Sequence, residues 1–165
     1  MIFNIYRKNK KKLFMLDEKK KKKFSIIYKG SKKNQTMIMK NKKRQVIYTV
    51  YPSTYANKPQ IKIFSGEECL LTCNCVSMFV DRELEFDFMG NVRYRLKYIE
   101  TNEGRKSVYN ITDERDKKII GTISLLRGEE NDRSFEVEVN DNYYRDYMVL
   151  FPLCLEICYY KNENI

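Results

Sequence analysis

Residues 147–158 read YMVLFPLCLEIC, a run in which Glu156 alone carries a charge. A helix that is apolar on every side must be buried on every side, and a β-rich domain allows this when its sheet closes into a barrel around the helix. A central strand is the alternative interpretation, but the length of the run and its lack of alternation favour a helix. The sequence therefore predicts a buried C-terminal helix, with Asp141 or Asn142 as its N-cap.

Two residues within this run depart from a regular buried helix. Pro152 lacks an N–H, and it is expected to remove one hydrogen bond and to bend the helix. Glu156 either pairs with a Lys or Arg inside the domain or marks the point at which the helix emerges into water. Tyr159, Tyr160 and Lys161 follow closely, and they favour the second interpretation.

Upstream, residues 84–98 (LEFDFMGNVRYRLKY) show the clearest strand pattern in the chain. Apolar side chains at 84, 86 and 88, and again at 92, 94, 96 and 98, alternate with charged ones, as expected of half-buried strands. A three-residue loop at 89–91 sets Asp87 opposite Arg93 and Glu85 opposite Arg95. A two-residue loop would place the acids opposite aromatic residues, so the three-residue register is predicted.

The same unit of strand, polar turn and strand recurs along the chain. It is seen at 13–28, 36–51, 60–75 and 106–126, with a single strand at 134–139 and a further possible one at 2–6. The stretches 52–59 and 127–133 are interpreted as loops. Short strands at regular spacing are typical of sandwiches and barrels. The prediction is a mainly β fold, in which residues 1–165 form a single domain: a closed antiparallel barrel of about twelve strands around the buried apolar C-terminal helix.

This arrangement resembles the tubby C-terminal-like superfamily, which includes tubby proteins, plant LURP-one-related proteins and phospholipid scramblases. FDFMGNVRYRL (86–96) and ITDERDKKIIGTI (111–123) resemble its repeated strand–turn–strand unit, and YYRDYMVLFPLCLEICYY (143–160) stands where the family has its core helix. The resemblance implies a twelve-stranded antiparallel barrel around a central helix, and it points to phospholipid as a ligand. No Lys/Arg pair matches the phosphoinositide-binding pair of tubby, so that role is assigned to no residue.

The chemistry available to the chain argues against an enzyme. The sequence has no His, which removes the commonest general base and the commonest metal ligand. P-loop, dinucleotide-binding and nucleophile-elbow motifs are absent from it. Cys69, Cys73 and Cys75, and the helical pair Cys154 and Cys158, are interpreted as reduced and mostly buried core residues. Neither a metal nor a cofactor is expected.

Charge is distributed unevenly along the chain. Residues 1–66 carry 19 Lys and Arg against two acids, whereas residues 67–165 carry 13 against 20. A strong positive field favours an anionic partner, although a compositional bias towards Lys would give the same count. The candidate lipid-contacting residues are the lysines of two clusters, which are Lys10, Lys11, Lys12, Lys19, Lys20, Lys21, Lys22 and Lys23.

Two partners fit these lysines. Clustered Lys beside Phe14 and Phe24 is attracted to acidic membrane leaflets, so the first hypothesis is a binding or scaffold domain that contacts anionic phospholipid. The alternative is a nucleic-acid-binding protein that uses the same basic region. Against it, Lys greatly outnumbers Arg in this region, and the sequence shows no known nucleic-acid-binding motif. With no secretory signal and no transmembrane segment in the sequence, the expected location is the cytoplasm, with peripheral contact to a membrane.

Overall fold

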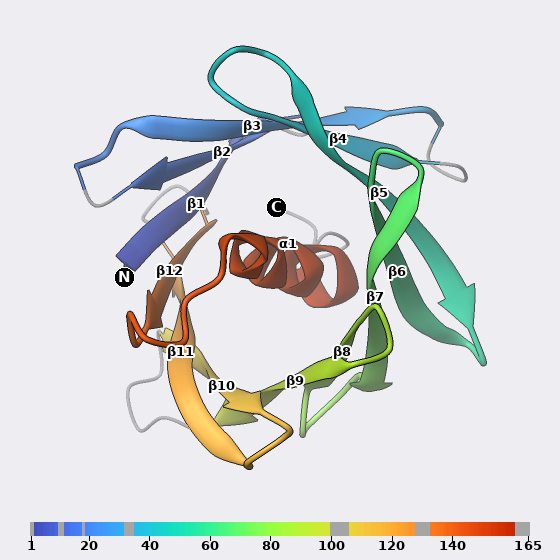
Figure 1. Ribbon diagram of the computed structural model, residues 1–165, viewed down its shortest axis with the longest axis vertical. Coiled ribbons are helices and arrows are strands. Elements are labelled where there is room, and N and C mark those ends of the chain that lie inside the picture. The colour runs from blue at the N-terminus through green and yellow to red at the C-terminus, as the bar shows by residue number, and fades with distance from the viewer. Residues whose placement is uncertain are drawn as a thin grey trace.

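The chain folds into a closed antiparallel barrel of twelve strands with its last helix inside (Figure 1). The structure is a computed structural model, and it describes residues 2–9, 12–17, 19–31, 35–99, 106–127 and 133–160. The barrel closes where the first strand pairs with the last, with Ile2 opposite Glu138 and Ile5 opposite Phe135. The predicted mainly β barrel around a C-terminal helix is therefore confirmed.

Each strand pairs with its neighbours in sequence, so the sheet is a simple up-and-down meander. The strands are β1 (Ile2–Asn9), β2 (Lys12–Asp17), β3 (Lys22–Lys29), β4 (Thr36–Lys40), β5 (Val46–Tyr55), β6 (Lys58–Ser65), β7 (Glu68–Ser77), β8 (Glu83–Phe88), β9 (Val92–Ile99), β10 (Lys106–Asp113), β11 (Lys118–Arg127) and β12 (Arg133–Val139). Most of the stretch 127–133, predicted as a loop, lies outside the described residues.

The β8–β9 hairpin has the predicted three-residue register. Glu85 pairs with Arg95 and Asp87 pairs with Arg93, which places the charged pairs on one face of the hairpin. Gly90 at the tip has a φ of +75°, a conformation that glycine adopts without steric cost. Alternation along both strands then sends the aromatic residues between these charged positions into the core.

The predicted loop at 52–59 is wrong, because strands occupy most of it. β5 continues through Pro52, which pairs with Ile61 of β6. Pairing between β4 and β5 ends at Met37 with Val50. Beyond that point β5 has a partner on one side only among the described residues, so a missing N–H is tolerated. The turn itself is the two residues Ala56 and Asn57, both with positive φ, as in the tight hairpin turns that follow strand twist.

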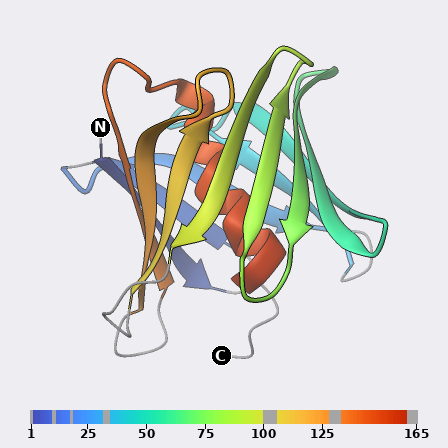
Figure 2. The ribbon, with the colours of Figure 1, turned by 90° about the horizontal axis from the view of Figure 1, so that it is seen from below.

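A helical segment runs along the barrel interior (Figure 2). It begins as the 3-10 helix η1 (Asp146–Val149), continues as the α-helix α1 (Leu150–Leu155) and ends in a π-helical turn, η2 (Glu156–Tyr160). Every residue of α1 and η2 is buried. Phe151 packs between Phe86, at 4.4 Å between ring centroids, and Tyr94, at 5.6 Å. The barrel thus supplies the all-round burial that the apolar sequence requires.

The expected effect of Pro152 is softened by its position. It is the third residue of α1, within the first turn, where the N–H groups have no partner in the same α-helix. The preceding turn is of the tighter 3-10 type. A proline at this point removes no interior α-helical hydrogen bond, so the segment accommodates it by changing helix type.

Glu156 contradicts the preferred interpretation of a helix end in water. Its side chain is 3% exposed, and its Oε1 accepts a hydrogen bond from Nη2 of Arg133 at 3.2 Å. Arg133 opens β12 and is itself 5% exposed. The alternative weighed from the sequence, a pair inside the domain, is the one that the structure shows. A buried carboxylate requires such a partner because desolvation disfavours its charged form.

Candidate anion-binding surface

The tip of the β2–β3 hairpin is organised by one carboxylate. Oδ1 of Asp17 accepts hydrogen bonds from the backbone N–H of Lys19, at 3.0 Å, and of Lys21, at 2.8 Å. Lys20 sits between them with a φ of +57°. The hydrogen bond from the backbone N–H of Lys21 contributes most to lowering the pKa of Asp17 below its ordinary value, so the carboxylate is charged at neutral pH. The lysines therefore project from a turn that is stabilised by hydrogen bonds to Asp17.

All five lysines of this tip, Lys19–Lys23, are exposed. Lys19, Lys20 and Lys21 form the turn, and Lys22 and Lys23 begin β3. Lys23 pairs with Oδ2 of Asp17 at 3.5 Å. The remaining four have no ion pair with any described residue. The hairpin tip predicted from the sequence is confirmed, and it presents more positive charge than its single described acid neutralises.

The other predicted cluster is placed differently. Lys10 and Lys11 lie outside the described residues, and Lys12 opens β2 at the end away from the tip. β2 spans six residues, about 20 Å at the usual rise of a strand. Lys12 and Lys22 nevertheless approach the same ring, because their Nζ atoms lie 5.1 and 4.4 Å from the centroid of Phe14. Two of the predicted residues are thus joined through one aromatic side chain.

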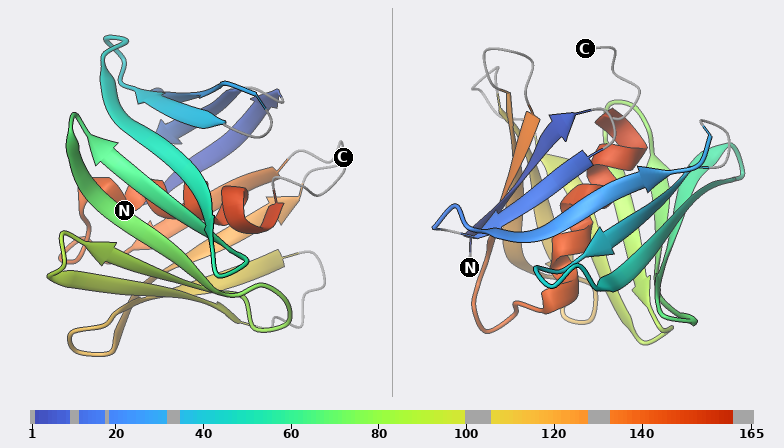
Figure 3. Two further views of the ribbon diagram at one scale, coloured as in Figure 1. Left: turned by 90° about the vertical axis from the view of Figure 1, so that its right-hand side faces the viewer. Right: turned by 90° about the horizontal axis from the view of Figure 1, so that it is seen from above.

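A second basic turn was missed by the sequence analysis. The β4–β5 connection carries Lys42, Lys43 and Arg44, all exposed, around a turn in which Asn41 and Gln45 hydrogen-bond each other through their side chains. Antiparallel pairing puts it at the same end of the barrel as the β2–β3 tip, and both tips project from the barrel wall (Figure 3). The basic residues of this turn were visible in the sequence, but placing them with the β2–β3 tip required the meander topology, in which every second turn lies at the same end.

Charge is therefore divided around the barrel wall. Among the described residues of 12–65, 13 are Lys or Arg and Asp17 is the one acid. Among those of 66–160, 11 are basic and 14 are acidic. The lopsided charge noted in the sequence becomes a basic side of the molecule, made by β2–β6, and a mixed side made by the rest. This division is a property of the fold, because a meander keeps sequence neighbours together in space.

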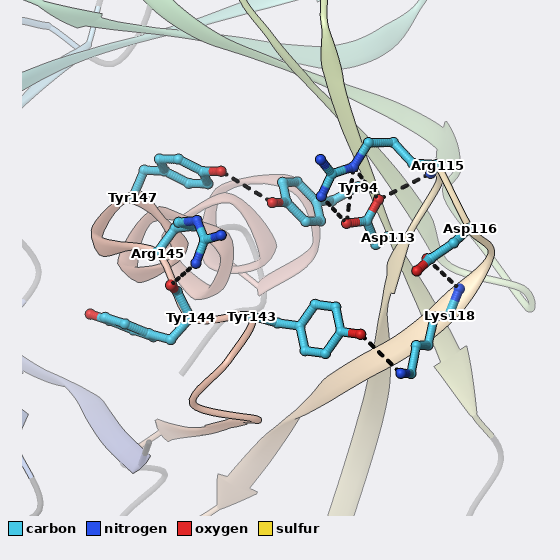
Figure 4. A network of polar contacts seen from close by, with 9 residues as sticks. All are labelled: Tyr94, Asp113, Arg115, Asp116, Lys118, Tyr143, Tyr144, Arg145 and Tyr147. Carbon is cyan, nitrogen blue, oxygen red and sulfur yellow. Dashed lines mark hydrogen bonds and ion pairs between the residues drawn. The ribbon is translucent and has the colours of Figure 1, made fainter.

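On the mixed side several basic residues are paired (Figure 4). The guanidinium of Arg115 donates two hydrogen bonds to Asp113, of 3.0 Å from Nε and 2.6 Å from Nη2. Lys118 donates to the hydroxyl of Tyr143 at 2.9 Å. Arg95 contacts three carboxylates, whose residues are Glu83 at 2.6 Å, Glu85 at 2.5 Å and Glu114 at 3.3 Å. These pairs neutralise positive charge on the mixed side, whereas most of the lysines at the β2–β3 and β4–β5 tips have no such partner among the described residues.

The barrel interior offers no comparable site. Cys73, Cys75, Cys154 and Cys158 are buried free thiols, and burial raises the pKa of Cys73 and Cys154. Cys69 is half-buried. Within the described part of the chain no group of His, Cys, Asp or Glu is arranged to hold a metal ion. The four buried thiols pack as core residues, in agreement with the sequence interpretation, whereas Cys69 is not part of the core cluster.

No family model, no curated protein and no solved structure matches the chain. In the described residues no helix has both the length and the apolar character needed to cross a bilayer.

Proposed function

We propose that this protein is a non-enzymatic binding domain that attaches peripherally to anionic phospholipid through the lysine-rich tips of β2–β3 and β4–β5. The observation that carries the proposal is the charge of residues 12–65, with 13 basic residues and one acid among those described. Ion pairs neutralise little of it, since Lys23–Asp17 is the only one these 13 make within the described chain.

The energetics favour a membrane surface. A basic residue close to an acidic leaflet contributes about 1 kcal/mol, so a cluster of exposed lysines yields useful affinity even when each contact is weak. The lysines remain hydrated while they gain this attraction, because hairpin tips project from the barrel. The attraction is long-range but screened, since the Debye length is about 8 Å at physiological salt.

Lipid is preferred to nucleic acid for two reasons. Twelve of the 13 basic residues are Lys, whose ammonium group is a point charge suited to a diffuse phosphate surface. Arg, by contrast, forms bidentate hydrogen bonds with phosphates and with the edges of bases. The charge also sits on projecting turns rather than in a groove of the kind that tracks a nucleic-acid strand. The resemblance to the tubby C-terminal-like superfamily supports phospholipid in the same way and remains a prediction.

The test is co-sedimentation with vesicles of phosphatidylcholine alone or mixed with phosphatidylserine, over a range of salt concentrations. Two double variants remove the same charge: Lys20→Gln/Lys21→Gln on the β2–β3 tip, and Lys97→Gln/Lys117→Gln on the mixed side. We expect the first to lose affinity for acidic vesicles by roughly thirtyfold at low salt and the second to lose much less.

Three results would contradict this. The parent protein could ignore acidic vesicles at low salt, the two variants could lose affinity equally, or an oligonucleotide could outcompete the vesicles at matched salt. The last result would replace lipid by nucleic acid as the partner of the same surface.

A further inference from the structure

Three strands of the basic side, β2, β3 and β4, are apolar on both faces. Antiparallel strands that face water on one side alternate between apolar and polar residues, whereas strands covered on both sides read as nearly continuous apolar runs. Strands β8 and β12 of the mixed side alternate in this way, with the sequences ELEFDF and RSFEVEV. Strands β2, β3 and β4 of the basic side do not, since they read KLFMLD, KKFSIIYK and TMIMK.

The second apolar set of the basic side points out of the barrel. Inward positions of these strands, such as Leu13, Ile26 and Met37, belong to the core cluster around the helix. The apolar residues at the alternate positions are absent from that cluster. They are Phe14, Leu16, Ile27, Ile38, Tyr51 and Phe64, and we call them the outer apolar stripe.

Cross-strand pairing places three residues of the stripe, Ile27, Ile38 and Phe64, in one row across the wall. Lys12 pairs with Ile27, Ile27 with Ile38, Ile38 with Thr49, and Thr49 with Phe64, across five strands from β2 to β6. Tyr51, 45% exposed, lies beside this row with its ring 5.4 Å from that of Phe64. The row is an apolar band over the wall, with Ile27, Ile38 and Phe64 half-buried.

Lysines surround this band. Lys12 begins the row, Lys62 pairs with Tyr51, and Lys40 pairs with Ser25 next to Ile27. The Nζ atoms of Lys12 and Lys22 both lie over the ring of Phe14, which is 8% exposed. Long basic side chains that cover apolar surface while holding their charge at the edge are the arrangement that suits a membrane interface.

From this geometry we infer that the outer face of β2–β6 is the face that lies on the lipid surface, with the outer apolar stripe in contact with the acyl boundary and the lysines around it on the phosphates. The inference rests on the proposed function and adds a part of the binding that salt does not screen. It also fixes the orientation, since the barrel axis then lies along the membrane rather than across it.

A second copy of the chain does not suit this face. A two-fold dimer places the same patch opposite itself, and here it would bring a set of lysines against the same lysines. Like charges in contact are repelled at an interface. An acidic bilayer, by contrast, meets both the apolar band and its basic border.

The chain contains no Trp, so single reporters can be placed at will. Ile38→Trp puts one on the stripe, and Ile119→Trp puts the control on β11, where Ile119 is 58% exposed on the mixed side. With phosphatidylserine vesicles containing brominated lipid, we expect a blue shift and quenching of the Trp at position 38 and neither at position 119. Ile27→Ser and Ile38→Ser should each weaken binding about tenfold at roughly 1 M salt, where the Debye length is about 3 Å.

The outcomes separate the two proposals. If acidic vesicles bind the parent protein at low salt and Lys20→Gln/Lys21→Gln weakens that binding, but the two Trp reporters respond alike, the inference fails and the proposed function stands. Loss of all binding at 1 M salt would overturn the inference in the same way. If the parent binds no acidic vesicle, both fail. A blue shift at position 38 that grows with protein concentration without lipid would show a second copy on this face and would also overturn the inference.

Discussion

Glu156 and Arg133 form an ion pair inside the barrel, with 3.2 Å between Oε1 and Nη2 and side chains 3% and 5% exposed. The pair links the π-helical end of the inner segment to the first residue of β12. The ring of Tyr160 lies near the same guanidinium, with its centroid 5.7 Å from Cζ of Arg133. The end of the helix is thus held by a charge pair inside the barrel.

Breaking this pair should destabilise the protein strongly. Removing one partner of a buried ion pair leaves the other charge in a poor solvent, at a cost of about 3–5 kcal/mol. We expect Glu156→Leu to lower the free energy of unfolding by this amount in urea titration, and Glu156→Leu/Arg133→Met to recover much of it. Arg93→Ala, at an exposed pair with Asp87, should cost under about 1 kcal/mol. The interpretation would be contradicted if the double variant were as unstable as Glu156→Leu alone.

The helix should be as necessary to the core as the strands. Leu150 and Leu155 are 0% exposed, so Leu150→Ala or Leu155→Ala should each cost about 2–5 kcal/mol. The measurement is the midpoint of denaturant unfolding at constant slope. Midpoints unchanged within error for both variants would show that the helix does not fill the barrel.

The thiols should differ in reactivity. Burial raises the pKa of Cys73, Cys75 and Cys154, and the thiolate is the reactive form. We expect Ellman's reagent to label the native protein first at Cys69, which is half-buried, and to label all five thiols only on unfolding. Cys69→Ser serves as the control. Rapid labelling of that variant in native buffer would show that the interior opens easily.

Acid should act partly through Asp113. The side-chain hydrogen bonds from Arg115 contribute most to lowering the pKa of this carboxyl in the folded protein. In the unfolded chain the pKa of an Asp is about 3.9. A group with a lower pKa in the folded state stabilises the protein above the unfolded pKa and loses this contribution as pH falls through the folded value. Asp113→Asn should therefore be less stable than the parent at pH 7, and the difference in Tm should shrink below about pH 4. A difference constant from pH 7 to pH 2 would refute this.

Gly121 permits a close approach between β11 and β12. A Cβ there would lie 2.3 Å from the carbonyl oxygen of Glu138 and 3.0 Å from Cα of Val139. Replacing Gly by Ala inside a strand ordinarily stabilises it by roughly 0.5–1 kcal/mol. Here we expect Gly121→Ala to destabilise by about 1–3 kcal/mol, as overpacking does, whereas Thr122→Ala next to it should have a small effect. A Tm raised by Gly121→Ala would contradict the crowding.

The sequence predicted those parts of the fold that depend on local pattern. Period-two alternation in residues 84–98 was sufficient for the β8–β9 register, and the apolar run at 147–158 was sufficient for the inner helix. Pro52 misled the prediction, because whether a strand tolerates proline depends on which neighbour it has on each side. That neighbour is decided by the paired strand lengths and cannot be read from residues 52–59.

Other features depended on contacts between distant segments. Whether Glu156 reached water or a partner was settled by Arg133, and nothing near either residue in sequence links them. In the candidate surface, the exposure of Lys19–Lys23 followed from their place at a turn. The contribution of Lys42, Lys43 and Arg44 needed the topology, since only the meander shows that both turns are at one end.

The pairing of β1 with β12 has a consequence for assembly. Ile2 finds its partner Glu138 only after β12 has been made, so until then the growing sheet keeps two open edges. Open edges template pairing with other chains, and contacts between residues so distant in sequence form slowly. The finished barrel is closed and leaves the end of β5 unpaired on one side among the described residues, while the unfinished sheet has two open edges. The vulnerable period of this protein is therefore the interval between the synthesis of β11 and the closure of the ring, when holding by chaperones would matter most.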